Sequence, residues 1–108
     1  MTRGDFVTIA IQGDYGKPRP AVIIQADQFH EHATVTVLPV TSTRVAAPLF
    51  RIAIQPSDAN GLQKASQVMV DKAITVKRSR VGQVFGRIDP DSMLEVERCL
   101  AVFLGIAK

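Results

Sequence analysis

The sequence has no tryptophan, one tyrosine, one cysteine and no long apolar run. The single cysteine, Cys99, excludes a disulfide framework and a thiolate-rich zinc site within one chain, and it fits the reducing cytosol. No apolar stretch reaches the ~18–20 residues that a membrane span requires. The first five residues lack the apolar core of a signal peptide, which argues against secretion by that route. We therefore expect a cytoplasmic protein with no membrane partner.

Familiar catalytic motifs are also missing, because there is no Walker-type loop, no G-x-S-x-G elbow and no His-Glu-x-x-His pair. The nearest approach to a metal site is His30-Glu31-His32, but a stable site needs three or four placed ligands, so a solvated turn is favoured. The same histidines lie too close in sequence to flank opposite sides of one phosphate as an acid–base pair. We expect no metal and no cofactor, and we interpret Cys99 as a small apolar residue.

The charge balance is mildly basic. Thirteen Lys and Arg face ten Asp and Glu among 108 residues, a formal net charge of +3, which weakly indicates a polyanionic partner. The length suits one domain spanning residues 1–108. Lys17 and Arg19 form one basic group, and a second run contains no acid: Lys72, Lys77, Arg78, Arg80 and Arg87. For any residue of that run, a solvated basic face is as good an interpretation as a binding site.

The residue pattern predicts a chain that is mostly β-strand. Strands are expected over residues 5–12, 20–26, 34–40, 49–55 and 66–70, with a possible continuation over 73–76 and a bent strand over 81–88. Residues 77–80 should form a basic turn or a single helical turn. Pro39 donates no ladder hydrogen bond, so we expect its strand to end there or to lie at an edge.

The last element carries the clearest helix signals. Asp89 suits the N-cap, Pro90 suits the first helical position, and Gly105 suits the C-terminal stop. Apolar residues at three- and four-residue spacing predict the buried face: Met93, Val96, Leu100, Phe103 and Leu104. Many short strands followed by one helix predict a mainly β (α+β) fold, either a small barrel or a half-open sheet with a helix packed on it.

Two prolines bracket an arginine in Lys17-Pro18-Arg19-Pro20, at the entry to an apolar strand. Each proline biases the preceding residue towards extended geometry, so Arg19 is held on a stiff backbone. A rigid guanidinium can grip a phosphate through two parallel hydrogen bonds. An ion pair with an acid such as Asp27, or capping of carbonyls at a barrel rim, is an equally good interpretation of the same residue.

Hydroxyl groups follow another strand in Thr41-Ser42-Thr43. At a strand end they can donate to phosphate oxygens, although turn capping is the commoner role. An arginine at the start of one strand and a threonine at the end of another could meet at one rim of a small barrel.

Six segments of the chain, in this order, carry a family resemblance. They are Arg3-Gly4-Asp5-Phe6-Val7; Arg19-Pro20-Ala21-Val22-Ile23-Ile24; Pro39-Val40-Thr41-Ser42; Val70-Asp71-Lys72-Ala73-Ile74-Thr75-Val76; Arg80-Val81-Gly82 with Phe85-Gly86-Arg87-Ile88; and Leu104-Gly105-Ile106. Together they resemble the MazF/PemK family of toxin endoribonucleases from bacterial type II toxin–antitoxin pairs. The resemblance implies a small SH3-like (CcdB/PemK-like) barrel with a C-terminal helix, assembled as a homodimer.

The resemblance also implies an activity, namely metal-independent, sequence-selective cleavage of single-stranded RNA, chiefly messenger RNA. The family's catalytic arginine and threonine correspond to Arg19 and Thr41. The RNA 2′-hydroxyl would be the nucleophile, leaving a 2′,3′-cyclic phosphate and a 5′-hydroxyl end. A cognate protein antitoxin, expected as an acidic and partly disordered peptide laid over the RNA groove, is the implied second partner.

Further residues are predicted to hold the RNA. The first loop, 13–17, is shorter than the loop that often covers the RNA groove in family members. In its place Tyr15 can stack a base and Lys17 can meet a phosphate, although Tyr15 can also simply pack against the barrel rim. The remaining RNA-binding candidates are Ser42, Thr43, Lys72, Lys77, Arg78, Arg80 and Arg87.

Two other functions stay open. One is a toxin of the same fold that binds DNA gyrase and cleaves nothing. That group relies on an aromatic residue near its C-terminus, whereas this chain has no tryptophan and retains Arg19-Pro20. The other is a catalytically silent module that binds RNA or antitoxin, in which Arg19 and the basic run only hold phosphates.

Overall fold

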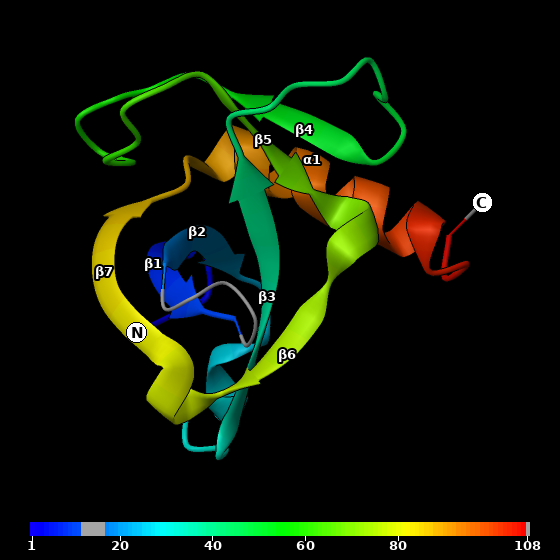
Figure 1. The fold of residues 1–108 in the computed structure, drawn as a ribbon. Coiled ribbons are helices and arrows are strands. Elements are labelled where there is room, and N and C mark those ends of the chain that lie inside the picture. Colours follow the sequence, from blue (N-terminus) through cyan, green and yellow to red (C-terminus); the bar gives the residue numbers. More distant parts are fainter. Residues whose placement is uncertain (12–16, 108) are drawn as a thin grey trace.

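The computed structural model describes residues 1–11 and 17–107 and shows a strongly curved sheet with a helix packed at one end (Figure 1). The strands are β1 (Asp5–Ala10), β2 (Pro18–Ile23), β3 (Thr34–Thr41), β4 (Arg51–Ile54), β5 (Ser66–Met69), β6 (Ile74–Lys77) and β7 (Val81–Arg87). Three 3-10 turns, η1 (Asp27–Phe29), η2 (Val70–Lys72) and η3 (Arg78–Arg80), and the helix α1 (Pro90–Phe103) complete the described elements. The predicted mainly β fold with a C-terminal helix is confirmed.

All the strand pairs are antiparallel, and their order is β4-β5-β3-β2-β1-β7, with β6 paired to β3 beside this path. The pairing among the described residues does not close, because β4 and β7 lie at the two ends of the path. The result is an open, barrel-like sheet. The apolar run of β2 is explained by burial on both faces, because Val22 enters one apolar core while Ala21 and Ile23 enter another.

Strand β3 changes neighbours along one edge. Its first half, Thr34 to Val37, pairs with β6, whereas Val40 and Thr41 pair with β5. Pro39 lies between these two ladders and opposite Ala21 of β2. The prediction that the strand ends at Pro39 or becomes an edge there is therefore wrong. A missing N–H is tolerated at this changeover, where the ladder on one side is interrupted.

Two apolar cores lie on opposite faces of the central strands. Val35 and Val37 of β3 are fully buried in one core, while Leu38 is fully buried and Val40 is buried in the other. This alternation is the period-2 pattern of a strand covered on both faces. The second core also receives Met93 and Val96 of α1, and the helix thereby closes that side of the sheet.

The helix begins and ends as its sequence predicts. The Asp89 carboxylate accepts the backbone N–H of Ser92 at 2.9 Å, Pro90 follows it, and Gly105 adopts a φ of 76° after the last turn. The predicted buried face is only half correct. Phe103 and Leu104 are 49% and 57% exposed, because the last turn of α1 extends past the sheet (Figure 1).

Two shorter predictions are also resolved. The predicted basic turn over 77–80 is confirmed as η3, and the bent strand over 81–88 is confirmed as β7, whose pairing with β1 contains two register shifts. The strand expected to continue over 73–76 is instead a separate strand, β6, because η2 interrupts the chain after β5. No helix among the described residues is long and apolar enough to cross a membrane.

The N-cap of α1 gives a direct test of how the helix is held. Asp89→Ala should lower the free energy of unfolding by about 1 kcal/mol at neutral pH, because an orphan N–H loses its acceptor. Bonds from Ser92 hold the pKa of Asp89 below its usual range, so its stabilisation is present at neutral pH and lost in acid. The difference between wild type and variant should therefore shrink below about pH 4. Urea unfolding measures both effects, and Asp89→Ser, which keeps a cap, should lie close to wild type.

Candidate functional site

Two hollows share an edge formed by strands β2 and β3. The first hollow, about 500 Å³, is lined by residues 8, 19–20, 40–43, 61–64, 66 and 85. The second hollow, about 620 Å³, is lined by residues 11, 19, 39–41, 69 and 71–74. Three residues line both hollows: Arg19, Val40 and Thr41. The arginine and threonine predicted as a phosphate site therefore occupy the edge that separates the two spaces.

The register of β2 against β3 explains why Arg19 and Thr41 come together. Ala21 pairs with Pro39 at the end of this ladder, and Arg19 and Thr41 each lie two residues beyond that last pair. Residues two apart on a strand point to the same face, so both side chains lie on the face that Pro39 presents to the second hollow. On the other side of β2, Arg19 pairs with Ile9 of β1, and this pairing holds the backbone of Arg19 in place.

The Thr41 hydroxyl has a defined direction. Its oxygen accepts the backbone N–H of Thr43 at 3.1 Å, and its own hydrogen remains to be donated. The turn that follows is clamped by the buried Gln67 side chain. The Gln67 amide accepts the N–H of Val45 at 3.0 Å and donates to the Val45 carbonyl at 2.8 Å. These bonds present the hydroxyls of Ser42 and Thr43 to the first hollow on a fixed backbone.

The opposite wall of the first hollow is a loop organised around buried Asn60. The Asn60 side-chain oxygen accepts the N–H groups of Ser57 and Leu62 at 3.0 and 2.9 Å, and its amide nitrogen donates to the Gln55 carbonyl at 2.8 Å. Contact with β7 is very close, since a Cβ added at Gly86 would lie 2.0 Å from the Asn60 carbonyl oxygen. Residues 61–64 thereby form a fixed wall.

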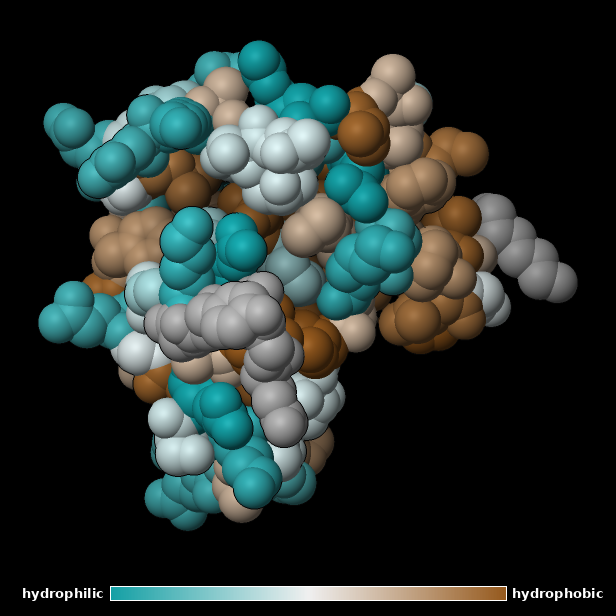
Figure 2. All heavy atoms as spheres, viewed as in Figure 1, coloured by the Kyte–Doolittle hydropathy of each residue, from teal (hydrophilic) through white to brown (hydrophobic). Residues whose placement is uncertain are grey.

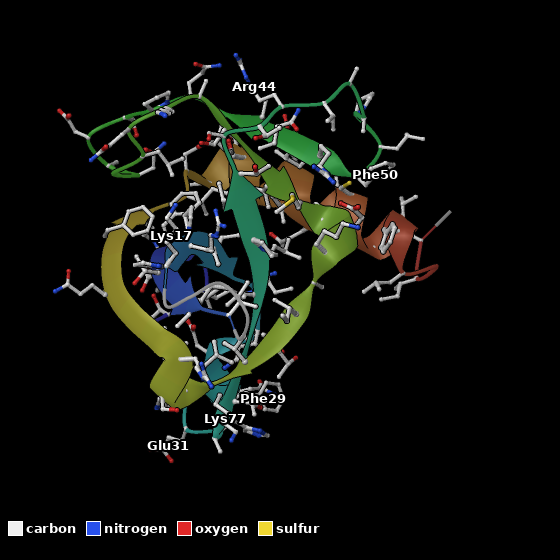
Figure 3. The ribbon with its side chains drawn as sticks, in the orientation of Figure 1. Lys17, Phe29, Glu31, Arg44, Phe50 and Lys77 are labelled. Carbon is white, nitrogen blue, oxygen red and sulfur yellow. The ribbon has the colours of Figure 1, made fainter. Side chains whose placement is uncertain are left out.

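Several predicted RNA-binding residues lie at these hollows. Ser42 and Thr43 line the first hollow and Lys72 lines the second. Lys17 is exposed and immediately precedes β2; its side chain is labelled in Figure 3. Tyr15 lies outside the described residues.

The other basic candidates line neither hollow. Lys77 pairs with Thr34, seven residues from Thr41 along β3, or ~23 Å at a rise of ~3.3 Å per residue, and Figure 3 shows it at the far end of the molecule.

Arg78 donates to the carbonyls of His30 and His32. Arg80 is exposed in η3. Arg87 is paired with Asp5 at 2.7 Å. Asp27, considered as a partner of Arg19, accepts the backbone N–H of Arg3 at 2.7 Å.

Sequence reasoning missed part of both hollows. The wall at 61–64 and Phe85 complete the first hollow, and Asp71 adds a carboxylate to the second. Asp71 is the acid immediately before the basic run, but nothing local indicates that it lines the same hollow as Arg19 and Thr41. The residues of the wall are joined to the site only by long-range contacts, for which the sequence carries no periodic signal.

The Asp71 carboxylate is stabilised in its ionised form by neighbouring groups. Burial would raise the pKa of this carboxyl, but the hydrogen bond and charge of Arg51, a backbone bond and the charge of Lys72 together hold it below its usual range. The Arg51 Nε atom donates to the carboxylate at 3.0 Å. Burial, together with the Asp71 charge, raises the pKa of the Cys99 thiol. Among the described residues, no three His, Cys, Asp or Glu side chains gather as metal ligands.

Fold and site together define a class: a small, open antiparallel β-barrel with a C-terminal helix and an arginine–hydroxyl edge between two hollows. The same fold occurs in an endoribonuclease solved with its cognate antitoxin from a mycobacterial species (TM-score 0.84, 24% identity, covering 100% of this chain and 98% of that one). It also occurs in the Mycobacterium tuberculosis toxin MazF-mt6 (TM-score 0.82, 18% identity, covering 96% and 99%).

Sequence comparison identifies the family. The chain is 49% identical, over 108 residues and 99% of each chain, to a protein of Mycolicibacterium smegmatis named "Probable endoribonuclease MazF". Residues 2–104 match the family model of the PemK-like, MazF-like toxins of type II toxin–antitoxin systems. The protein belongs to this family.

The close contact between β7 and the Asn60 loop can be tested with a matched pair of glycines. Gly86→Ala should cost about 1–3 kcal/mol of unfolding free energy, because its Cβ would strike a backbone carbonyl that cannot rotate away. Gly82→Ala is the comparison, since its Cβ would lie 2.3 Å from the Thr8 hydroxyl, an atom of a rotatable side chain. Urea unfolding should show the larger loss for Gly86→Ala, and equal losses would contradict a rigid contact.

Proposed function

We propose that this toxin cleaves single-stranded RNA, chiefly messenger RNA, in a sequence-selective and metal-independent reaction. The observation that supports this most directly is the shared edge of the two hollows, which Arg19 and Thr41 both line. A scissile phosphate at this edge leaves one hollow for the nucleotide on each side. The name of the 49% identical relative points to the same activity.

The reaction requires few catalytic groups from the protein, because the 2′-hydroxyl of the RNA is itself the nucleophile. The 2′-hydroxyl oxygen forms a bond to phosphorus and loses its proton, while the bond from phosphorus to the 5′-oxygen breaks and that oxygen gains a proton. The products are a 2′,3′-cyclic phosphate and a 5′-hydroxyl end. The protein supplies geometry and stabilises the negative charge that develops on the phosphorane.

Arg19 and Thr41 suit different parts of that task. A guanidinium binds two phosphate oxygens through charge-assisted hydrogen bonds, and its pKa above about 12 makes it a charge stabiliser rather than a general base. The Thr41 hydroxyl, whose oxygen already accepts the N–H of Thr43, donates its hydrogen to a phosphate oxygen. Ser42 and Thr43 in the first hollow and Lys72 beside the second add donors for the neighbouring phosphates.

Removing these groups tests the reaction. Arg19→Ala should lower the cleavage rate of a long mixed-sequence RNA in EDTA by ~10²–10³-fold, the usual loss when a donor to a developing oxyanion is removed. Thr41→Val, which keeps the shape, should also lose most of the activity. Arg44→Ala is the charge-matched control, because Arg44 is exposed, lines neither hollow and points outward in Figure 3.

Each outcome of that assay is informative if circular dichroism shows that the variants fold. Cleavage that requires added Mg²⁺, or that survives in Arg19→Ala, would contradict the mechanism. An RNA that binds wild type but is never cut would favour the silent binding module.

An antitoxin partner is the second part of the proposal. Solved relatives of the same fold include an endoribonuclease with its cognate antitoxin and a MazE–MazF complex from Deinococcus radiodurans (TM-score 0.78, 23% identity, covering 99% of this chain and 98% of that one). In this chain an acidic peptide laid over the two hollows would meet Arg19, Lys64 and Lys72. Such a peptide would compete directly with RNA for the same cations.

A homodimer is the third part, and an exposed apolar face supports it. Leu49 and Ile106 are each 78% exposed, and Val102, Phe103 and Leu104 are also exposed. Leu49 and Val102 line one shallow groove, and Figure 2 shows apolar surface gathered where the C-terminal end of α1 lies. Exposed apolar residues grouped in this way are typical of a protein interface, and a second copy of the chain would bury them.

The oligomeric state can be tested by a matched pair of charge insertions. Val102→Asp should convert a dimer into a monomer, because it places a carboxylate in the apolar face. Val84→Asp should leave the dimer intact, since Val84 has similar exposure but lies on β7. Sedimentation velocity at micromolar concentration measures the mass, and a monomeric wild type would contradict the proposal.

A further inference from the structure

The second hollow differs from the first in containing an acid. Its floor is largely apolar, formed by Pro39, Met69 and Ile74 among others. Asp71 contributes the one carboxylate found among the described residues that line either hollow. An acid beside a phosphate site opposes the charge of the substrate, so its presence there calls for a ligand group other than phosphate.

The Asp71 carboxylate is fixed in place but not fully engaged. Its Oδ1 atom accepts Arg51 Nε at 3.0 Å, and the side chains of Arg51 and Asp71 are 13% and 15% exposed. Contacts of Oδ2 are longer, at 3.5 Å from Arg51 Nη2 and 3.6 Å from Lys72 Nζ. Distances of this length make weak hydrogen bonds at best. A backbone hydrogen bond occupies one further acceptor site, but an ionised carboxylate has about four such sites, so it retains capacity to accept a hydrogen bond.

A nucleobase matches this combination of surfaces. The apolar floor can take the flat face of a base, and an ionised carboxylate accepts hydrogen bonds without donating any. Adenine, cytosine and guanine each carry an exocyclic amino group that can donate to it. Uracil carries none, and its one Watson–Crick donor, N3–H, lies between two carbonyl oxygens that the carboxylate would repel. Unpaired bases in RNA are read through these edges.

We propose that the second hollow binds the base of a nucleotide next to the scissile phosphate, and that Asp71 selects a base with an exocyclic amino group over uracil. This specificity rests on the proposed RNA cleavage at Arg19 and Thr41. It assigns the two hollows unequal roles, because the first offers hydroxyl and amide donors and the second offers an acceptor on an apolar floor.

Cleavage of a random-sequence RNA pool in EDTA, followed by sequencing of the new ends, tests the selection. Wild type should show one position beside the cut at which adenine, cytosine or guanine exceeds uracil by at least about fivefold, as expected for one good edge contact. Asp71→Asn, which keeps the size but adds a donor, should reduce that ratio to near unity at that position only. Asp58→Asn removes the same charge from an exposed residue that lines neither hollow and should keep the wild-type preference.

A binding measurement separates this inference from the cleavage proposal and needs no protein variant. Short oligonucleotides with a 2′-deoxy sugar at the cut position cannot be cleaved, and their affinity for wild type can be measured by fluorescence anisotropy. Replacing adenosine by purine riboside, or guanosine by inosine, removes only the amino group and should lower the affinity; an unchanged affinity for both analogues would contradict the role of Asp71.

The outcomes are distinct. Selective binding without cleavage would overturn the proposed activity and leave the role of Asp71 standing. Cleavage with equal use of uracil at every position beside the cut, or an unchanged preference in folded Asp71→Asn, would overturn the role of Asp71 alone. If Asp71→Asn is less stable but keeps the wild-type base preference, the proposal is overturned, and the role of Asp71 is to form the ion pair with Arg51.

Discussion

The antiparallel ladder between β2 and β3 sets both the packing of the interior and the position of the site. Its register pairs Val22 with Leu38 and Ala21 with Pro39, and alternate residues enter the two cores. Arg19 and Thr41 lie two residues beyond the last of these pairs, and both line the two hollows. A slip of one residue would turn every side chain to the other face. Burial of the core and assembly of the site therefore depend on the same hydrogen bonds.

Rigid walls surround side chains that are themselves accessible. Arg19 is exposed, yet prolines on both sides and the ladder with β1 define its backbone. The two walls of the first hollow are held by buried amides, Gln67 beneath the hydroxyl turn and Asn60 inside the facing loop. Such an arrangement suits a reaction in which the substrate supplies the nucleophile, since positioned donors then provide most of the stabilisation.

The positions of a few charged side chains matter more for the two hollows than the net charge of the protein. A net charge of +3 is small, and much of the basic run is used elsewhere, as Arg87 binds Asp5 and Arg78 binds the carbonyls of residues 30 and 32. What distinguishes the two hollows is the sign and geometry of a few groups at their edges. Asp71, held by Arg51, gives one hollow an acceptor while the shared edge keeps its cation.

Local sequence is enough to predict the capped helix from Pro90, the β-branched strands and the stiff Pro18-Arg19-Pro20 segment, because each is encoded by residues within a few positions of one another. It also carried the resemblance that singled out Arg19 and Thr41. Tertiary structure alone decided which groups surround them. The 61–64 wall, Phe85 and Asp71 reach the hollows from segments twenty or more residues beyond Thr41, through strand pairing and the contact of Asn60 with Gly86. The same physics exposed Phe103 and Leu104, since a helical stripe is buried only as far as the sheet beneath it extends.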